Sequence, residues 1–76
     1  MIKKYDEVFL DVFNIKEDEL DNLKYQSIDS WDSVGHMTLI VALETAFDIE
    51  MEMDDIIDFE SYKKGIEIIT KYGVEF

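Results

Sequence analysis

Apolar residues at the start of the chain recur at steps of three and four positions, which is the spacing of one face of an α-helix. The residues that share this spacing are Ile2, Tyr5, Phe9, Val12 and Phe13, with Val8 beside them. The pattern predicts an amphipathic helix over residues 2–14, with Asn14 as the residue at which it ends.

No sustained period follows in residues 15–32, where polar and apolar side chains alternate irregularly. We therefore expect a long connection there, with a short turn around residues 17–23. Four apolar side chains of this segment are expected to hold it against the core: Leu20, Leu23, Tyr25 and Ile28.

From Ser33 onward a second helical stripe follows, and it is continuous. Its members are His36, Leu39, Ile40, Leu43 and Phe47, again at steps of three and four. At the start of this central helix, Asp32 or Ser33 can accept a hydrogen bond from a backbone N–H group, the capping role expected of such residues. His36 is interpreted as the first residue of the core stripe, with its polar ring near solvent.

Two further helices are predicted in the last third of the chain. A short one near residues 53–58 is indicated by Met51, Ile56, Ile57 and Phe59. Ser61 can cap a last helix, and Gly73 lies beyond its end. The apolar side of that helix carries Tyr62, Ile66, Ile69 and Tyr72. Because no strand-like alternation competes, the pattern predicts an all-α fold, a small four-helix bundle with a long first loop and a short third helix.

The chain length of 76 residues allows a single domain, residues 1–76, with a small core. Cysteine is absent, which excludes disulfides, thiolate metal sites and a cysteine nucleophile. Asp6, Glu7 and Asp11 interrupt any apolar region of a signal peptide, and no apolar run approaches the length of a membrane span. We expect a cytoplasmic protein without membrane insertion.

The balance of charge limits the kinds of partner. Nineteen acidic residues stand against seven basic ones, all lysines, so the formal net charge is -12. Such a charge repels nucleic acid and anionic membrane surfaces and favours partners with basic surfaces. At 47% hydrophobic residues the chain is too apolar for the disordered acidic class, so the charge belongs to a folded surface.

Two groups of polar residues suggest chemistry but lack the rest of a site. Ser33 and His36 are spaced as a nucleophile and base on one helix face. A hydrolase also needs an orienting acid, an oxyanion hole and a cleft, and no G-x-S-x-G motif is present. Asp54, Asp55 and Asp58 do not follow the spacing of a calcium loop, which also needs a turn glycine. We therefore expect no enzyme and no metal site, and interpret the three aspartates as a solvated acidic face.

Ser33 has two interpretations that spacing alone leaves open. It can cap the central helix, or its exposed hydroxyl can carry a modification. The second interpretation rests on the N–H groups and the positive dipole end at a helix start, which favour a phosphate attached there.

Residues 32–51, DSVGHMTLIVALETAFDIEM, resemble the signature of the acyl carrier protein family, which also includes peptidyl carrier domains. In that family an Asp-Ser motif followed by Leu, Met or Val opens the second helix, and an A-L-E-x-x-F-like segment follows at a set separation. Residues 32–34 and 42–47 match these two elements. The resemblance covers nearly the whole chain, including the long first loop and the short acidic third helix.

The resemblance implies a non-catalytic carrier. The motif serine of the family carries 4'-phosphopantetheine, transferred from coenzyme A by a separate phosphopantetheinyl transferase, and the terminal thiol holds an acyl or aminoacyl group as a thioester. Ser33 matches that serine, and Asp32 would lie beside the metal or basic groups of the transferase. Ser30, in the similar tripeptide of residues 29–31, is the weaker candidate because it lies three residues too early for the family's register.

The resemblance also implies a docking surface. Family members dock onto basic patches of partner enzymes through the start and exposed side of the second helix. The matching positions are Val34, Met37, Val41 and Glu44, with Ile56 of the third helix as a weaker addition. The alternative for these side chains is partial packing in the core. The expected partners are the transferase, a loading enzyme and acyltransferases, and the carrier itself is expected to be a monomer.

The central helix has fewer acidic residues than carriers of fatty acid synthesis commonly have. The positions concerned are Gly35, Thr38, Thr45 and Ala46. This departure favours a carrier of a specialised pathway for short acyl or aminoacyl groups, and neither length nor motif separates these two. Phe9, Phe13 and Phe59 would limit the room for a long acyl chain inside the bundle. The alternative from another class is an unmodified acidic protein interaction module.

Overall fold

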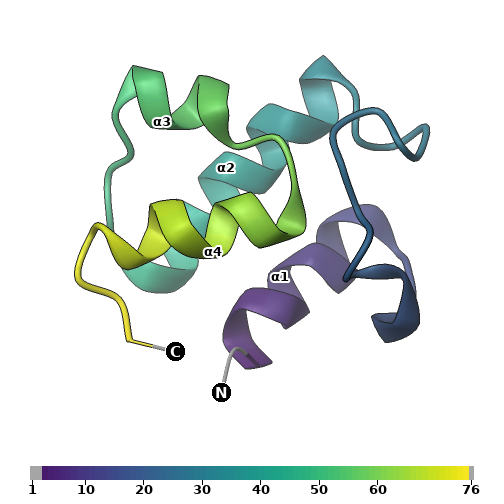
Figure 1. Ribbon diagram of the computed structural model, residues 1–76, viewed down its shortest axis with the longest axis horizontal. Coiled ribbons are helices and arrows are strands. Elements are labelled where there is room, and N and C mark those ends of the chain that lie inside the picture. Colours follow the sequence, from purple (N-terminus) through teal and green to yellow (C-terminus); the bar gives the residue numbers. More distant parts are fainter. Residues whose placement is uncertain (1–2, 76) are drawn as a thin grey trace.

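Four α-helices form the fold in residues 3–75, the part of the chain that the computed structural model describes. Their bounds are α1 Lys3–Phe13, α2 Ser33–Phe47, α3 Met53–Asp58 and α4 Tyr62–Thr70. In Figure 1, α2 lies behind α4, with α1 below and α3 above. The predicted small helical bundle with a short third helix is confirmed, while Ile2 of the first predicted helix lies outside the described residues.

The ends of the helices follow from their local sequence. Asn14 has a left-handed backbone with φ 54°, and its N–H group donates to Leu10 O at 2.8 Å. Asp48 ends α2 in the same conformation, with φ 55°, which asparagine and aspartate adopt more readily than most residues. At the start of α4, Ser61 Oγ accepts a hydrogen bond of 2.9 Å from Lys64 N–H. The predicted end at Asn14 and the predicted cap at Ser61 are both confirmed.

The long connection between α1 and α2 is held by the core and by the segment before α4. A single 3-10 turn, Glu17–Glu19, lies where a short turn was predicted. The apolar residues of the connection lie in the core or at its edge: Leu20 and Leu23 are buried, Tyr25 and Ile28 half-buried. Tyr25 N–H donates to Glu60 O at 2.9 Å, and Tyr62 N–H donates to Leu23 O at 3.0 Å. These backbone hydrogen bonds fasten the connection to the segment at the start of α4.

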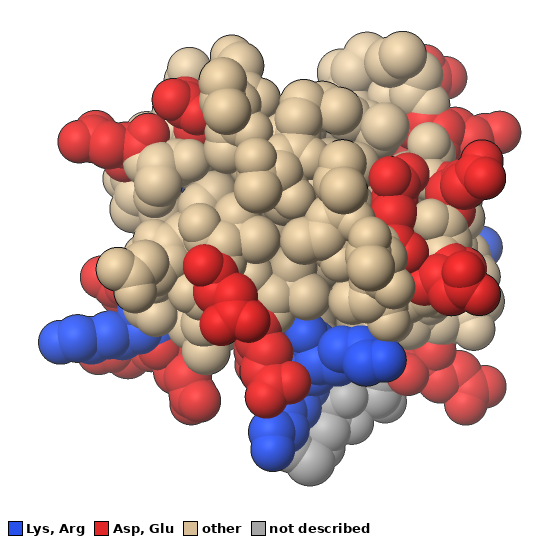
Figure 2. Space-filling model, turned by 180° about the vertical axis from the view of Figure 1, so that it is seen from behind, with Lys and Arg blue, Asp and Glu red and all other residues tan. Residues whose placement is uncertain are grey.

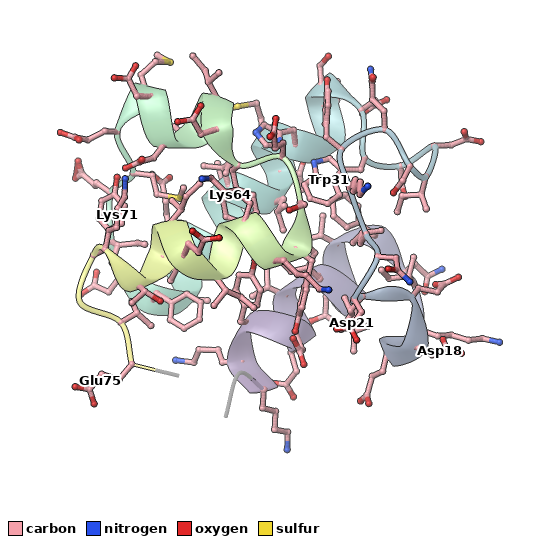
Figure 3. The ribbon with its side chains drawn as sticks, in the orientation of Figure 1. Asp18, Asp21, Trp31, Lys64, Lys71 and Glu75 are labelled. Carbon is pink, nitrogen blue, oxygen red and sulfur yellow. The ribbon has the colours of Figure 1, made fainter. Side chains whose placement is uncertain are left out.

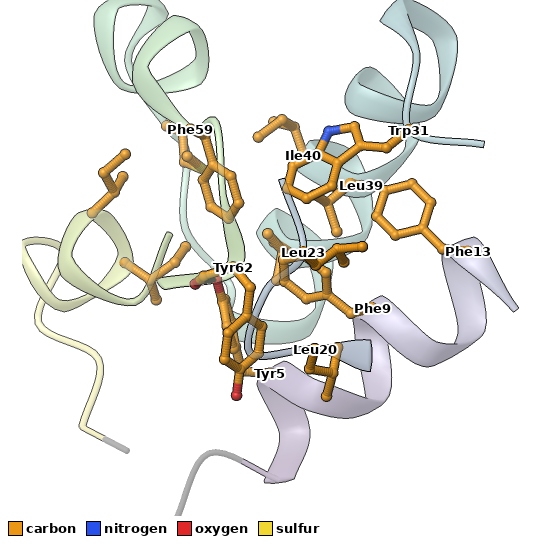
Figure 4. Packing of buried hydrophobic residues seen from close by; sticks show 14 residues of the cluster. Tyr5, Phe9, Phe13, Leu20, Leu23, Trp31, Leu39, Ile40, Phe59 and Tyr62 are labelled. Carbon is orange, nitrogen blue, oxygen red and sulfur yellow. Dashed lines mark hydrogen bonds between the residues drawn. The ribbon is translucent and has the colours of Figure 1, made fainter. Parts of the chain in front are cut away.

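Aromatic rings fill the centre of the bundle around Trp31 (Figure 4). The Trp31 indole is fully buried, stacks on the Phe13 ring at a centroid distance of 5.2 Å and meets the Phe9 ring edge-on at 5.8 Å. Phe9 in turn stacks on Phe59 at 6.3 Å. Because aromatic side chains remove much apolar surface from water, this cluster is a main source of stability in so small a domain. It also fixes the chain against α1 just before α2 begins.

The predicted apolar stripe of α2 is buried at its centre, as expected, and only half-buried at its ends. Its buried members are Leu39, Ile40 and Leu43, while His36 and Phe47 are half-buried. In α3, Ile56 is half-buried and Ile57 is exposed, although both were predicted from the same apolar pattern. Consecutive residues of a helix point in directions about 100° apart, so α3 packs Ile56 against the core and leaves Ile57 at the surface.

One isoleucine of the buried face of α4 differs from the prediction. Its buried residues include Tyr62 and Ile69, as predicted, but Ile68 is buried in place of the half-buried Ile66. Gly65 explains the difference, because a Cβ atom at this position would lie 2.2 Å from Phe59 Cζ and 2.2 Å from Tyr5 Oη. α4 therefore turns its glycine toward the aromatic core, and its neighbours on the helix rotate with it.

Candidate functional site

The start of α2 is capped by Asp32 rather than by Ser33. Asp32 has an extended backbone, and its Oδ1 atom accepts a hydrogen bond of 2.8 Å from Gly35 N–H. This bond satisfies one of the N–H groups that lack a partner in the first turn of a helix. The structure thus decides between the two residues that the sequence offered for the cap.

Ser33 is the first residue of α2, and its hydroxyl does not serve as the cap. The residue is exposed, and its Oγ atom lies 3.5 Å from Tyr25 Oη, where either oxygen can donate. An exposed hydroxyl at this end of a helix of 15 residues lies in the positive field of the helix dipole. The position can therefore accept a phosphate-containing group without loss of the cap.

Ser30, the weaker candidate, is also exposed but lies in the turn before the helix. Its carbonyl oxygen comes very close to the first turn of α2, because a Cβ atom at Gly35 would lie 1.9 Å from Ser30 O. A residue without a side chain is therefore required at position 35. Ser30 shapes the start of the helix through its backbone, whereas Ser33 presents a side chain there.

His36 joins the start of α2 to α3 through both of its ring nitrogens. Trp31 Nε1–H donates to His36 Nδ1 at 3.0 Å, and His36 Nε2 lies 2.8 Å from Ile56 O. Because a carbonyl oxygen only accepts, the partners assign the proton to Nε2 and leave Nδ1 as the acceptor for the indole. Neither nitrogen bonds to Ser33, so the two residues do not form a nucleophile and base pair in this geometry. His36 is half-buried, at the edge of the core stripe to which it was assigned.

A groove of about 400 Å³ opens between α2 and α3 beside Ser33. Its polar lining residues are Tyr25, Ser33, His36 and Glu60. Its apolar lining residues are Met37, Met53, Ile56, Ile57 and Phe59. Because the serine itself is part of the lining, a flexible group attached to it has an apolar surface within reach.

Large apolar side chains are exposed on both helices beside this groove. They are between 49% and 76% exposed and comprise Val34, Met37 and Val41 of α2 and Met53 and Ile57 of α3. Figure 2, which shows the rear of the molecule on the side of α2, has a wide uncharged area with acidic side chains at its borders. The three apolar docking residues predicted on α2 are thus at the surface. Met53 and Ile57 of α3 share this exposed apolar surface and were not among the docking residues predicted from the sequence.

The other two predicted docking residues also serve the fold. Glu44 Oε2 accepts a hydrogen bond of 2.8 Å from Met51 N–H, so its carboxylate fastens the connection between α2 and α3. Ile56 is half-buried against the core, lines the groove and offers its carbonyl oxygen to His36. Both residues therefore contribute to the position of α3.

One of the three aspartates predicted to form a solvated acidic face is buried instead. Asp55 Oδ1 accepts from Lys71 Nζ at 2.7 Å, and its Oδ2 accepts from Tyr72 Oη–H at 2.5 Å. Lys71, labelled in Figure 3, follows the end of α4, so this pair ties the C-terminal segment to α3. Tyr72 Oη also accepts from Glu52 N–H at 2.8 Å. Asp54 and Asp58 are exposed as predicted, and residues 3–75 contain no cluster of three or more potential metal ligands.

The ion pair of Asp55 predicts a pH-dependent contribution to stability. Hydrogen bonds from Lys71 and then Tyr72 hold the pKa of the Asp55 carboxyl below its ordinary value. A lowered pKa in the folded state stabilises the fold above the pKa of the unfolded chain, about 3.9, and this contribution is lost as the pH falls through the folded value. We expect Asp55→Asn to unfold several degrees below the wild-type protein at pH 7, and the difference to shrink below about pH 4.

Thermal unfolding followed by circular dichroism at pH 7 and pH 3 measures this effect. Asp54→Asn is the matched control, because it removes the same charge at an exposed position of the same helix. A difference between Asp55→Asn and the wild-type protein that stays the same size at both pH values would contradict the assignment.

No known protein family, curated protein or solved structure matches the chain. Among the described residues, none of the helices combines the length and the apolar character needed to cross a membrane. The functional inference therefore rests on the motif of residues 32–34 and on the geometry around Ser33.

Proposed function

We propose that this protein is an acyl carrier protein that holds acyl or aminoacyl groups as thioesters on a 4'-phosphopantetheine arm at Ser33. The observation that carries the proposal is the division of roles at the start of α2, where Asp32 caps the helix and leaves the Ser33 hydroxyl exposed. A serine that served only as a cap would accept the backbone hydrogen bond that Asp32 accepts here. The motif of residues 32–34 supports the same assignment.

Attachment of the arm requires one new bond at Ser33. Ser33 Oγ forms a P–O bond to the phosphorus of coenzyme A that bears pantetheine. The P–O bond to the adenosine bisphosphate half breaks, and a base of the transferase takes the serine proton. The negative charge of the phosphodiester then lies at the positive end of α2, where it is favourable. Asp32, next to the reacting oxygen, can face the metal or basic groups of the transferase.

The arm and the protein have different roles in this chemistry. When bound, the arm supplies a thiol that keeps the acyl carbonyl reactive and a flexible tether that raises its effective concentration near a docked enzyme. The protein supplies the attachment oxygen and a surface that enzymes recognise.

The docking surface combines apolar contact with acidic surroundings. Val34, Met37 and Val41 are exposed on α2, close to the attachment point. Glu44 is the acidic residue within α2, and it is engaged with the next connection. Exposed Asp54 and Asp58 on α3 add negative charge. Enzymes with basic patches around an apolar centre fit this surface. This favours partners from a specialised pathway over partners that bind a highly acidic second helix.

Short acyl or aminoacyl groups are the cargo that the packing favours. Phe9, Phe13 and Phe59 are buried in a continuous cluster of rings with Trp31. Room for a long acyl chain in the interior would require these rings to separate, with loss of their close packing. A short group on the arm needs no such opening.

A second function from another class is an unmodified acidic interaction module. The observation in its favour is the exposed apolar surface of α2 and α3, which can bind a partner without any modification of Ser33. The two functions share the docking surface and differ in the covalent state of one oxygen.

The test is to incubate the unmodified protein with coenzyme A and a promiscuous phosphopantetheinyl transferase, and to measure the intact mass. We expect a gain of one phosphopantetheine group, and peptide fragmentation is expected to place it on Ser33. An unchanged mass with several transferases would overturn the carrier function and favour the interaction module. A mass gain located on Ser30 would show that the arm is attached to Ser30 and not to Ser33.

A further inference from the structure

Tyr25 places a phenolic hydroxyl directly beside the proposed attachment oxygen. Its Oη atom lies 3.5 Å from Ser33 Oγ, although the two residues are eight positions apart in the sequence and Tyr25 belongs to the long first connection. The residue is half-buried and lines the groove together with Ser33. The apolar pattern had predicted for Tyr25 only a role in holding this connection against the core.

The surroundings of Tyr25 hold its hydroxyl in place. Its ring meets the His36 ring edge-on at a centroid distance of 5.5 Å and the Trp31 ring edge-on at 6.4 Å. His36 and Trp31 are themselves joined by a hydrogen bond. The backbone of Tyr25 is fixed through its N–H group, which donates to Glu60 O at 2.9 Å. A donor held from both ring and backbone loses little further freedom when it forms a hydrogen bond.

The other lining residues leave Tyr25 as the side-chain donor for a group on Ser33. His36 Nε2–H is already engaged with Ile56 O. Attachment through Oγ removes the hydroxyl proton of Ser33, and the Glu60 carboxylate only accepts. The remaining lining residues are apolar.

We propose that Tyr25 is a positioning residue for the arm, and that its hydroxyl donates a hydrogen bond to the phosphate carried by Ser33. This inference rests on the proposed function. Before attachment, Tyr25 Oη lies 3.5 Å from a neutral serine hydroxyl, which is longer than the roughly 2.5–3.0 Å of an ordinary O–H···O hydrogen bond. After attachment it meets anionic oxygens, and hydrogen bonds to an anion are shorter and stronger than those between neutral groups. Tyr25 thereby directs the first part of the arm along the groove instead of away from it.

The test is a thermodynamic cycle of four proteins: wild type and Tyr25→Phe, each without and with the arm. Phenylalanine keeps the ring contacts and removes only the hydroxyl. On modification, we expect the melting temperature of the wild-type protein to gain at least about 4–8 °C more than that of Tyr25→Phe, since this is the shift that one hydrogen bond of ordinary net strength gives in a domain of this size. The ³¹P resonance of the attached phosphodiester is expected to differ between the two modified proteins.

Tyr72→Phe is the matched control. It removes a tyrosine hydroxyl that bonds Asp55 and Glu52, outside the lining of the groove. It is expected to lower the melting temperature equally with and without the arm, because its hydroxyl acts in the fold alone. Equal changes on modification in the wild-type protein and in Tyr25→Phe would overturn the role of Tyr25 and leave the carrier function intact. Failure of the wild-type protein to be modified would overturn both.

Discussion

Loading with phosphopantetheine is expected to be lost completely when Ser33 is replaced by alanine. The substitution removes the oxygen that forms the new P–O bond at the first residue of α2, and alanine has no oxygen to replace it. Asp32 keeps its hydrogen bond to Gly35 N–H, and alanine is well tolerated in a helix, so the fold is expected to persist. Intact mass after incubation with coenzyme A and the transferase measures the loss.

The matched control for this prediction is Ser30→Ala, three residues earlier and also exposed. It is expected to load as the wild-type protein does, because its hydroxyl lies in the turn before the helix. The melting temperature of Ser33→Ala is expected to stay close to that of the wild-type protein, since substitutions at exposed positions usually change stability by less than about 0.5 kcal/mol. A mass gain in Ser33→Ala at the wild-type rate would refute the assignment of the attachment point.

Replacement of Trp31 by alanine is expected to have the largest effect on stability, with a loss of about 3–5 kcal/mol in the free energy of unfolding. Trp31 is fully buried, contacts Phe9 and Phe13 and donates its indole N–H to His36. Natural domains have roughly 0.05–0.15 kcal/mol of stability per residue, or about 4–11 kcal/mol for a chain of this length. The variant is therefore expected to be partly or wholly unfolded at 37 °C.

Urea unfolding followed by circular dichroism measures this loss. Trp31→Phe separates the two contributions, because it keeps an aromatic ring against Phe13 and removes only the donor to His36 and part of the packed volume. Its expected loss is smaller, at roughly 1–3 kcal/mol. A Trp31→Ala protein with a midpoint close to that of the wild-type protein would show that the aromatic cluster is not the centre of stability.

The positions of the helices followed from local patterns. The central helix begins at Ser33 and the third helix spans residues 53–58, as the apolar spacing predicted, and Ser61 caps the last helix. Such features depend on which side chains share a helix face and on which residue precedes the first turn. Residues close together in the sequence determine both. The choice of the serine came from a motif and not from periodicity, and it stays a prediction that mass measurement tests.

The errors of the sequence interpretation share one physical cause. Ile68 replaces Ile66 in the buried face of α4 because Gly65 lies against Tyr5 and Phe59, which come from other parts of the chain. Asp55, assigned to a solvated face, is buried because residues after α4 supply its partners. A helical pattern predicts a face but not the neighbour that the face will meet.

The amino-acid pattern alone therefore determined an all-α chain with a long first connection and an exposed serine at or near a helix start. Only the tertiary structure decided that Asp32 rather than Ser33 caps α2, that His36 bridges Trp31 and Ile56, and that Tyr25 lies beside the serine. The physical reason is the range of the interactions. Helix periodicity and capping act over a few residues, whereas the groups that surround Ser33 are brought together by packing of the aromatic core, and this packing depends on the whole chain.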